Sequence, residues 1–236
     1  MLKNYRKTKI LATIGPSSEK INKIEKLVLS GVDAFRINCS HTTDFQFKNY
    51  IENIRKVEKK LKKPIGILID LQGPKLRIGE IENNMALKRG QKLLLINNKK
   101  NLKPNEVLLQ EEKVFKSVKV NHPIFIDDGK IKLKVLKVSK NIIETKVILE
   151  GVLKSKKGIN LPETVLKNSA LTSADKKNVK KAMELGVDWI ALSFIQSPED
   201  IKDLRKICKK NVSIMAKIEK PSALNHINKI TELADG

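Results

Sequence analysis

The feature that most constrains the fold is an alternation of apolar runs and amphipathic stretches near both ends of the sequence. Residues 8–16 (T-K-I-L-A-T-I-G-P) predict a strand, and residues 18–30 predict a helix that ends at Gly31. The run A-F-R-I-N-C-S predicts a second strand, residues 43–62 a charged helix, and P-I-G-I-L-I-D-L a third strand. Strands that alternate with helices are typical of a parallel sheet or a barrel.

The alternation stops in the middle of the chain and later resumes. Residues 78–157 contain short β-type runs such as K-L-L-L-I, separated by Asn, Gly, Pro and Lys, which predicts an inserted all-β domain. The later part predicts a helix over 172–185, a strand over 187–194, a helix from Pro198 to about Lys209, the strand V-S-I-M-A-K-I-E and a last helix from Pro221. We count five strand-helix units, whereas a closed (β/α)₈ barrel needs eight.

These patterns predict an α/β fold, a parallel sheet or barrel with an inserted all-β domain. The expected division is a first barrel part at 1–77, the insertion at 78–157, and a continuation of the barrel at 158–236 that stops after unit five. An open sheet of this kind exposes strand edges and apolar helix faces. We therefore expect the isolated chain to be insoluble or inactive.

The stretch F-R-I-N-C-S-H at 35–41 places polar side chains at every second position. Phe35, Ile37 and Cys39 alternate with Arg36, Asn38 and Ser40. In a strand these two sets point to opposite faces, so one face is apolar and the other carries reactive groups. A strand with its polar face in water would give the same alternation, and periodicity alone leaves both interpretations open.

Other polar side chains follow the predicted strands at their carboxyl ends, where the active site of a parallel barrel lies. They are Asp70, Ser193, Lys217 and Glu219, in addition to the polar positions of 35–41. Lys217 and Glu219 would be a structural ion pair if they stood alone. Together with Arg36, Asp70 and an insertion that could act as a lid, they indicate a site for phosphate and a divalent metal.

The bulk properties exclude several classes of protein. The net charge of +22 invites a nucleic-acid hypothesis, but residues 78–157 hold 18 Lys and Arg against 9 Asp and Glu, so the charge is spread along the chain rather than gathered in a basic arm. Cys39 and Cys208 stand alone, which argues against a disulfide framework or a zinc site. The start has no apolar signal region and the longest apolar run is too short to span a bilayer. We expect a cytoplasmic protein with neither a nucleic-acid nor a membrane partner.

Seven motifs, taken in order, resemble the pyruvate kinase family across nearly all 236 residues. They are T-K-I-L-A-T-I-G-P-S-S, R-I-N-C-S-H, D-L-Q-G-P-K-L-R-I-G, D-D-G-K-I, K-K-G-I-N-L-P, W-I-A-L-S-F-I and I-M-A-K-I-E-K. Any one motif is weak, but seven in the family's order are specific. The family has a (β/α)₈ barrel interrupted after its third strand by a small β-barrel lid, so the resemblance implies an incomplete (β/α)₈ (TIM) barrel with an inserted small β-barrel lid domain. Family members are usually homotetramers and carry a C-terminal regulatory domain, to which nothing in this sequence corresponds.

The resemblance implies a role for each matching residue. Arg36 would hold nucleotide or the transferring phosphate, as a planar guanidinium suits oxyanions, and Lys217 would stabilise the phosphoryl group in flight. Glu219 would be one of two carboxylates that bind Mg²⁺ or Mn²⁺. The family's monovalent-cation ligands match Asn38, Ser40 and Asp70.

The remaining matches concern nucleotide and the lid. They are His41 near the nucleotide, Arg77 at the phosphate site and lid hinge, Lys157 at the nucleotide phosphates, and the lid residues Asp127 and Asp128. A surface salt bridge is the alternative for Arg77, and a hairpin turn at Asp128-Gly129 is the alternative for the aspartates. Lid closure would exclude water and align the phosphoryl donor and acceptor.

Two departures from the family pattern matter. Potassium-requiring members carry Glu at the position of Lys75 and Thr at that of Leu71. The Lys75 ammonium could place its charge where potassium would sit, so we predict that K⁺ is not required. The family's second metal-binding Asp and the Thr near the proton-transfer step lie in motifs that this sequence does not contain, and Mg²⁺ demands nearly octahedral oxygen ligation.

The resemblance implies that phosphoenolpyruvate and ADP are converted to pyruvate and ATP in glycolysis. Two alternatives stay open. One is a metal-dependent lyase or aldolase that acts on a pyruvate enolate, and the other is a catalytically inactive, truncated remnant.

Overall fold

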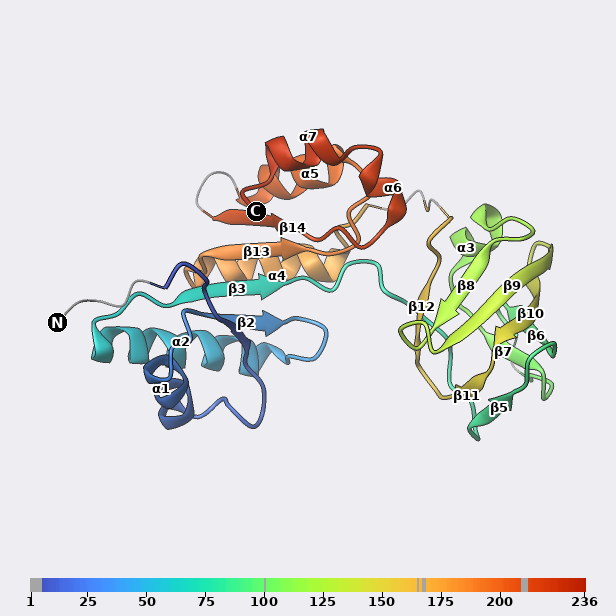
Figure 1. Cartoon of the computed structure of the whole chain (residues 1–236), viewed down its shortest axis with the longest axis horizontal. Helices are drawn as coiled ribbons and strands as arrows, with labels where there is room; N and C mark the ends of the chain where they lie inside the picture. Colours follow the sequence, from blue (N-terminus) through green and yellow to red (C-terminus); the bar gives the residue numbers. More distant parts are fainter. Residues whose placement is uncertain (1–5, 100, 165, 167–168, 209–211) are drawn as a thin grey trace. The chain divides into compact units, whose positions relative to one another are not determined.

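The computed structural model describes residues 6–99, 101–164, 166, 169–208 and 212–236. The chain divides into two compact units (Figure 1). The first, here called the barrel unit, contains Met1–Gly73, Ser169–Glu219 and Ala223–Gly236, and the second, the insertion unit, contains Pro74–Asn168 with Lys220–Ser222. The stretch 78–157, predicted to be an inserted domain, lies within the insertion unit.

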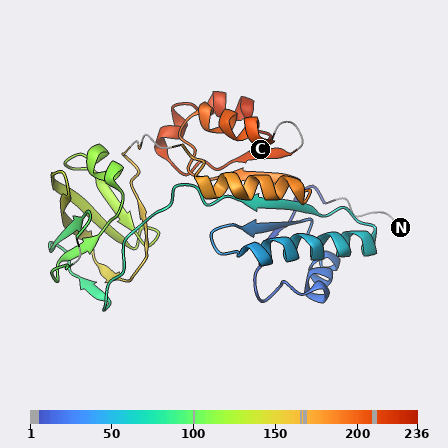
Figure 2. The same cartoon turned by 180° about the vertical axis from the view of Figure 1, so that it is seen from behind.

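The barrel unit is built on five parallel strands in the order β1-β2-β3-β13-β14. The strands are β1 (Leu11–Thr13), β2 (Ala34–Asn38), β3 (Gly66–Asp70), β13 (Trp189–Leu192) and β14 (Ser213–Ala216). Its helices are α1 (Ile21–Leu29), α2 (Asp44–Leu61), α4 (Ser173–Glu184), α5 (Pro198–Cys208) and α7 (Ile227–Leu233). Helix α6 (Pro221–Leu224) is divided between the two units, because Pro221 and Ser222 belong to the insertion unit. Figures 1 and 2 show helices along the outer side of a curled sheet. The predicted α/β class is confirmed.

Several element boundaries differ from the sequence-based expectation. Strand β2 ends at Asn38, so Ser40 lies in the turn that follows and not on the strand. Strand β14 ends at Ala216, so the last residues of the predicted strand, including Ile218, which is 41% exposed, lie beyond it. The segment after Pro221 forms two short helices, α6 and α7, instead of one. Lys209, the predicted end of the helix that begins at Pro198, lies outside the described residues.

Capping and burial explain why these segments adopt their structures. Thr43 caps α2 through a reciprocal bond with Gln46, and Thr172 caps α4 in the same way with Asp175. Phe35 and Ile37 of β2 are fully buried in the core between sheet and helices. Burial of apolar side chains of this size is worth about 1.5–3 kcal/mol each, which holds the polar face of β2 in one orientation.

Three Asp–Arg pairs anchor the amino ends of the strands. In each pair an aspartate binds an arginine and also accepts a hydrogen bond from a backbone N–H at the start of a neighbouring strand. Asp33 binds Arg6 and the Ile10 N–H, and Asp188 binds Arg55 and the Ile67 N–H. Asp235 binds Arg205 and the Ile214 N–H. The Ile10 N–H holds the pKa of Asp33 below its ordinary value, and the Ile214 N–H does the same for Asp235, helped by Arg205. These contacts lie at the end of the sheet that supports stability in barrel folds.

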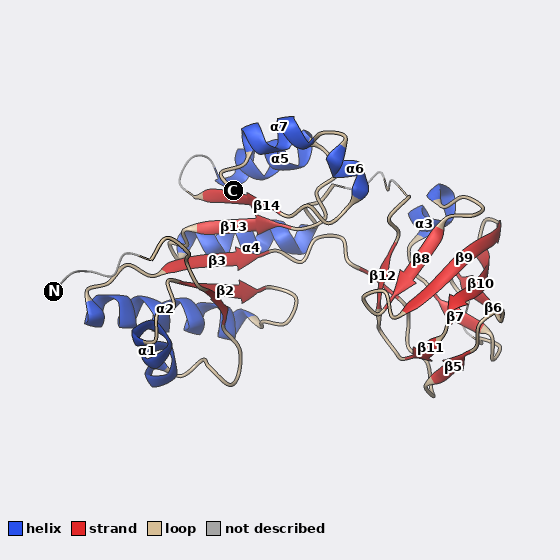
Figure 3. Ribbon diagram, viewed as in Figure 1, coloured by secondary structure: helices blue, strands red, loops and turns tan. Residues whose placement is uncertain are grey.

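The insertion unit contains a seven-stranded sheet in the order β4-β12-β8-β9-β10-β6-β7 and a two-stranded sheet, β11-β5 (Figure 3). Its elements are β4 (Leu76–Arg77), β5 (Met85–Leu87), β6 (Lys92–Ile96), β7 (Glu106–Leu108), α3 (Glu112–Ser117), β8 (Pro123–Ile126), β9 (Ile131–Val138), β10 (Ile142–Leu149), β11 (Gly151–Leu153) and β12 (Gly158–Asn160). Most strand pairs are antiparallel, and the unit has its own apolar core. The run of β-type segments in the sequence correctly indicated a mainly β insertion, but the all-β prediction missed the short helix α3.

Candidate active site

The candidate site lies in the barrel unit, at the carboxyl ends of four neighbouring strands. Arg36 and Asn38 come from β2 and Asp70 ends β3, while Ser193 follows β13 and Lys217 follows β14. Asn38 and Asp70 are paired in register, and Asp70 is paired with Ala191 of β13. Parallel register therefore brings residues far apart in the sequence to one edge of the sheet.

The Asp70 carboxylate binds both cations of the site. Arg36 approaches Asp70 Oδ2 through Nε at 2.8 Å and Nη2 at 2.6 Å, and its Nη1 donates to Thr13 Oγ1 at 3.0 Å. Lys217 Nζ lies 3.0 Å from Asp70 Oδ1 and 3.3 Å from Oδ2. The Asp70 side chain is only 4% exposed, so solvent screens these contacts weakly.

Lys217 has an acceptor for each of its three N–H groups. Besides Asp70 Oδ1, its Nζ lies 2.9 Å from Ser193 Oγ and 3.2 Å from Glu219 Oε1. The Glu219 Oε2 atom accepts from the backbone N–H of Phe194 at 3.0 Å. Asp70 and Ser193 are buried whereas Glu219 is exposed, so the Glu219 contact is the easiest to exchange for a ligand.

The charges in the cluster balance, with two cations, Arg36 and Lys217, against two carboxylates, Asp70 and Glu219. The Arg36 guanidinium has five N–H groups, and three of its contacts are already made to Asp70 and Thr13. The unused N–H groups, together with Lys217 once it releases Glu219, form a pair of donors for an oxyanion. These groups could accept an anion such as a phosphoryl group only by exchanging a contact that they now make within the cluster.

Cys39 lies beside this cluster but is not suited to react. Burial, reinforced by the carboxylates of Asp175 and Asp70, raises the pKa of the Cys39 thiol to about 12. Its backbone N–H donates to the Asp70 carbonyl at 3.0 Å, which continues the pairing between β2 and β3. Cys39 is thus a neutral thiol with a structural role.

The residues predicted to bind a monovalent cation are brought close in part. Asn38 and Asp70 are cross-strand partners, but Asn38 Oδ1 accepts from the Ser40 N–H at 3.0 Å and Asp70 is held by two cations. His41 has an exposed side chain, and its N–H donates to the Asn38 carbonyl. The β2 turn is thus stabilised by its own hydrogen bonds.

The predicted lid residues lie in the insertion unit. Arg77 Nη1 donates to the Lys156 carbonyl at 3.0 Å, and Lys157 Nζ lies 2.9 Å from Asp127 Oδ1. The hydrogen bond from Lys157 holds the pKa of Asp127 below its ordinary value. Asp127 and Asp128 adopt positive φ angles, 53° and 55°, in the turn between β8 and β9, which matches the hairpin alternative for these aspartates. Lys75 also belongs to this unit.

The donor set for a divalent metal is incomplete in the part of the chain that the structure describes. No group of three His, Cys, Asp or Glu side chains there is placed to hold a metal ion. Glu219 is the one exposed carboxylate of the cluster, because both oxygens of Asp70 are committed to Arg36 and Lys217. A complete Mg²⁺ site does not fit these residues, so no chemical step is assigned to a metal here.

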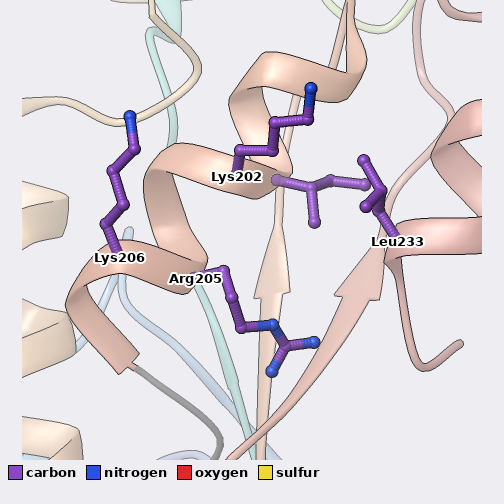
Figure 4. A pocket seen from close by; sticks show the side chains of 5 residues that line it. Lys202, Arg205, Lys206 and Leu233 are labelled. Carbon is purple, nitrogen blue, oxygen red and sulfur yellow. The ribbon is translucent and has the colours of Figure 1, made fainter.

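Two pockets among the described residues of the barrel unit lie away from this cluster, around α5 and beside it. One of about 420 Å³ is lined by Ile201, Lys202, Arg205, Lys206 and Leu233, between α5 and α7 (Figure 4). Another, of about 740 Å³, lies at the amino ends of β13 and β14 and includes the Arg205–Asp235 pair. Neither pocket is lined by a residue of the candidate site. The candidate site is therefore defined by the charged groups that meet at the strand ends.

Three contributors to the site were not predicted from the sequence. Thr13 binds Arg36, the backbone of Phe194 binds Glu219, and the fully buried Asp175 accepts from the N–H groups of Gln72 and Gly73 just after β3. For Asp175 a signal existed, since T-S-A-D at 172–175 is a capping box. The other two contacts join distant segments and have no local signal.

The fold and this cluster define the class of protein: an α/β-barrel protein with a β-domain inserted after the third strand and a cluster of paired charged side chains at the strand ends. Across the described residues, no helix is both long and apolar enough to cross a membrane. A sequence model of the pyruvate kinase barrel domain matches residues 5–236. The chain belongs to the pyruvate kinase family.

Curated relatives agree with this assignment. The chain is 42% identical over its whole length to a pyruvate kinase of Methylorubrum extorquens, covering 49% of that protein. It is 40% identical to one of Agrobacterium vitis and 38% identical to one of Buchnera aphidicola, with 99% of this chain and 50% of each relative aligned. The chain thus spans about half the length of these relatives.

Proposed function

We propose that this chain serves the pyruvate kinase reaction, in which the phosphoryl group of phosphoenolpyruvate passes to ADP and gives pyruvate and ATP in glycolysis. The observation that carries the proposal is the placement of Arg36 and Lys217 on one carboxylate, Asp70, at the carboxyl end of the sheet. Family membership supports the same reaction. The expected location is the cytoplasm.

In the proposed reaction, Arg36 and Lys217 neutralise charge on the phosphoryl oxygens. Phosphoryl transfer leaves little covalent work for the protein, so positioned cations are the main contribution that side chains make. Asp70 keeps the two cations beside each other before substrate arrives. Mg²⁺ or Mn²⁺ is the proposed metal cofactor, with Glu219 as one of its ligands. The proposed nucleotide contacts are Arg77 and Lys157 of the insertion unit and His41 of the barrel unit.

Potassium is proposed to be unnecessary. Asp70, which resembles a potassium ligand of the family, already carries two protein cations. A third cation on that carboxylate would meet repulsion from Arg36 and Lys217. Lys75, in place of the glutamate of potassium-requiring members, supports the same proposal.

The test is binding of phosphoenolpyruvate to the 236-residue chain by titration calorimetry, with pyruvate formation from MgADP measured in parallel. We expect binding without turnover, because the described residues supply an incomplete metal site. Arg36→Ala and Lys217→Met should each weaken binding about tenfold or more, the value of one charge-assisted hydrogen bond. Lys202→Met, at an exposed lysine of α5, is the matched control and should bind like wild type.

Failure of the wild-type chain to bind phosphoenolpyruvate at millimolar concentration, while it is folded by circular dichroism, would overturn the proposed role of this cluster. Enolisation of pyruvate or a related acid without any phosphate donor would instead favour the lyase or aldolase alternative.

A further inference from the structure

Lys217 and Glu219 follow β14 rather than lying on it. The backbone of Lys217 still donates its N–H to the Leu192 carbonyl of β13 at 3.1 Å, whereas the two side chains bind one dipeptide that follows β13. Lys217 Nζ donates to Ser193 Oγ at 2.9 Å, and Glu219 Oε2 accepts from the Phe194 N–H at 3.0 Å. Ser193 and Phe194 therefore contact the side chains of both site residues that follow β14.

The Ser193 hydroxyl is oriented for this role. It donates to the Leu71 carbonyl at 2.7 Å, and the Ser193 residue is 2% exposed. A hydroxyl has one proton, and the alternative acceptor, Asp70 Oδ1, is farther away at 3.3 Å. With the proton used on β3, the oxygen lone pairs face the Lys217 ammonium. Ser193 thus links the end of β3 to a cation that follows β14.

Phe194 adopts a positive φ angle, and its backbone N–H holds Glu219. Its φ angle is +57°, a region that costs a bulky L-residue about 1–2 kcal/mol. In this conformation its N–H points at Glu219. On the other side lies Gly73, where an added Cβ would come within 2.9 Å of the Phe194 ring and 3.2 Å of the Ser193 carbonyl. Backbone strain that persists against such a cost is typical of functional sites.

We propose that the Ser193-Phe194 turn sets the positions of Lys217 and Glu219, and that Ser193 is a positioning residue acting through Lys217. The catalytic meaning of this role rests on the proposed function, whereas the positioning itself does not. The turn leaves Lys217 with one exchangeable contact, to Glu219, and two buried ones, to Asp70 and Ser193.

The experiment is trace labelling of the folded 236-residue chain with acetic anhydride, followed by peptide mass mapping. The reactivity of Lys217 is expressed relative to exposed Lys202 in the same digest. In Ser193→Ala the reactivity of Lys217 should rise about tenfold, because one hydrogen bond to a charged group is lost. Ser193→Thr keeps the hydroxyl and should keep the wild-type ratio of Lys217 to Lys202 reactivity. Ser193→Val has the shape of the threonine variant without its hydroxyl and should behave like Ser193→Ala. Ser213→Ala, at the amino end of β14, is the matched control.

Unchanged Lys217 reactivity in the alanine and valine variants would overturn the proposal, even if their melting temperatures fall. Where Ser193→Ala does not fold, the threonine and valine variants decide, and Phe194→Gly gives an independent measurement. Glycine adopts positive φ without strain, so this variant should fold, and loss of the ring beside Gly73 should at least double Lys217 reactivity; an unchanged ratio counts against the turn.

Calorimetric titration of the same variants with phosphoenolpyruvate separates this proposal from the proposed function. A rise in Lys217 reactivity in a chain that binds no phosphoenolpyruvate supports the positioning role and removes the catalytic interpretation. If the wild-type chain binds phosphoenolpyruvate but Lys217 reactivity is unchanged in the variants, the proposed function is supported and the positioning role of Ser193 is overturned.

Discussion

Replacing Asp175 by alanine tests how the chain segment beyond β3 is held in place. Asp175 is fully buried and accepts four hydrogen bonds. Its Oδ1 accepts from the N–H groups of Gln72 at 3.0 Å and Gly73 at 3.4 Å, and its Oδ2 accepts from Thr172 N at 3.0 Å and Thr172 Oγ1 at 2.6 Å. One carboxylate therefore joins the residues after Asp70 and Leu71 to the first turn of α4.

The expected loss follows from those contacts. Removing the capping-box partner of α4 costs about 1 kcal/mol. Leaving the buried Gly73 N–H and its neighbour without an acceptor costs about 1–3 kcal/mol more. We expect Asp175→Ala to lower the free energy of unfolding by about 3 kcal/mol, and Asp175→Asn by about half of that, because asparagine keeps one acceptor oxygen where two are used.

The assay is urea unfolding followed by circular dichroism, in which a loss of this size lowers the midpoint by about 1–2 M. Asp203→Ala is the matched control, since Asp203 pairs with Lys206 at the surface and such pairs contribute less than about 1 kcal/mol. A loss below about 1 kcal/mol in Asp175→Ala, or equal losses in the alanine and asparagine variants, would refute the reasoning.

Three further predictions concern the cation requirement, the thiols and the strand anchors. In a potassium-free assay of a full-length form that turns over, added KCl should change the rate of pyruvate formation less than about twofold, because the Lys75 ammonium is proposed to replace potassium; stimulation of about tenfold would contradict this. Iodoacetamide at pH 8 should label neither cysteine of the folded chain but both in urea, since burial raises the pKa of Cys39 to about 12 and that of Cys208 to about 11, above the ordinary 9.0. The same shifts contribute stability below pH 9 that is lost as the pH rises towards 11–12, so the urea midpoint should fall over that range. Asp188→Ala removes the 2.9 Å pair with Arg55 and the 2.7 Å bond from Ile67 N–H; a melting temperature within 1 °C of wild type would argue against a supporting role.

Most of the fold was predictable because its signals are local. The alternation of Phe35 and Ile37 with polar neighbours predicted a strand, and β2 buries both side chains completely. Charged helices with Thr caps appeared within a few residues of their predicted limits, at Asp44–Leu61 and Ser173–Glu184. Periodicity and capping act over one or two turns of chain, which a sequence displays directly.

The strand ends were harder to predict. The alternation in the sequence continues through Ser40 and Glu219, yet the strands end at Asn38 and Ala216. Backbone hydrogen bonds continue one residue past both ends, from the Cys39 N–H to the Asp70 carbonyl at 3.0 Å and from the Lys217 N–H to the Leu192 carbonyl at 3.1 Å. How far the pairing extends depends on register across the sheet rather than on the strand's own residues. The error matters, because residues beyond a strand end are held by side-chain contacts.

The sequence by itself determined the order of strands and helices in the barrel unit, the mainly β character of the insertion and the family to which the chain belongs, because these depend on local periodicity and on motifs in order. It also singled out Arg36, Asp70, Lys217 and Glu219 as residues of one site. Only the tertiary structure decided which of them touch. Parallel register brings Asp70 between the cations of β2 and β14, and the turn after β13 brings Ser193 and the Phe194 N–H to Lys217 and Glu219. These contacts join segments more than twenty residues apart, so no local pattern in the chain encodes them.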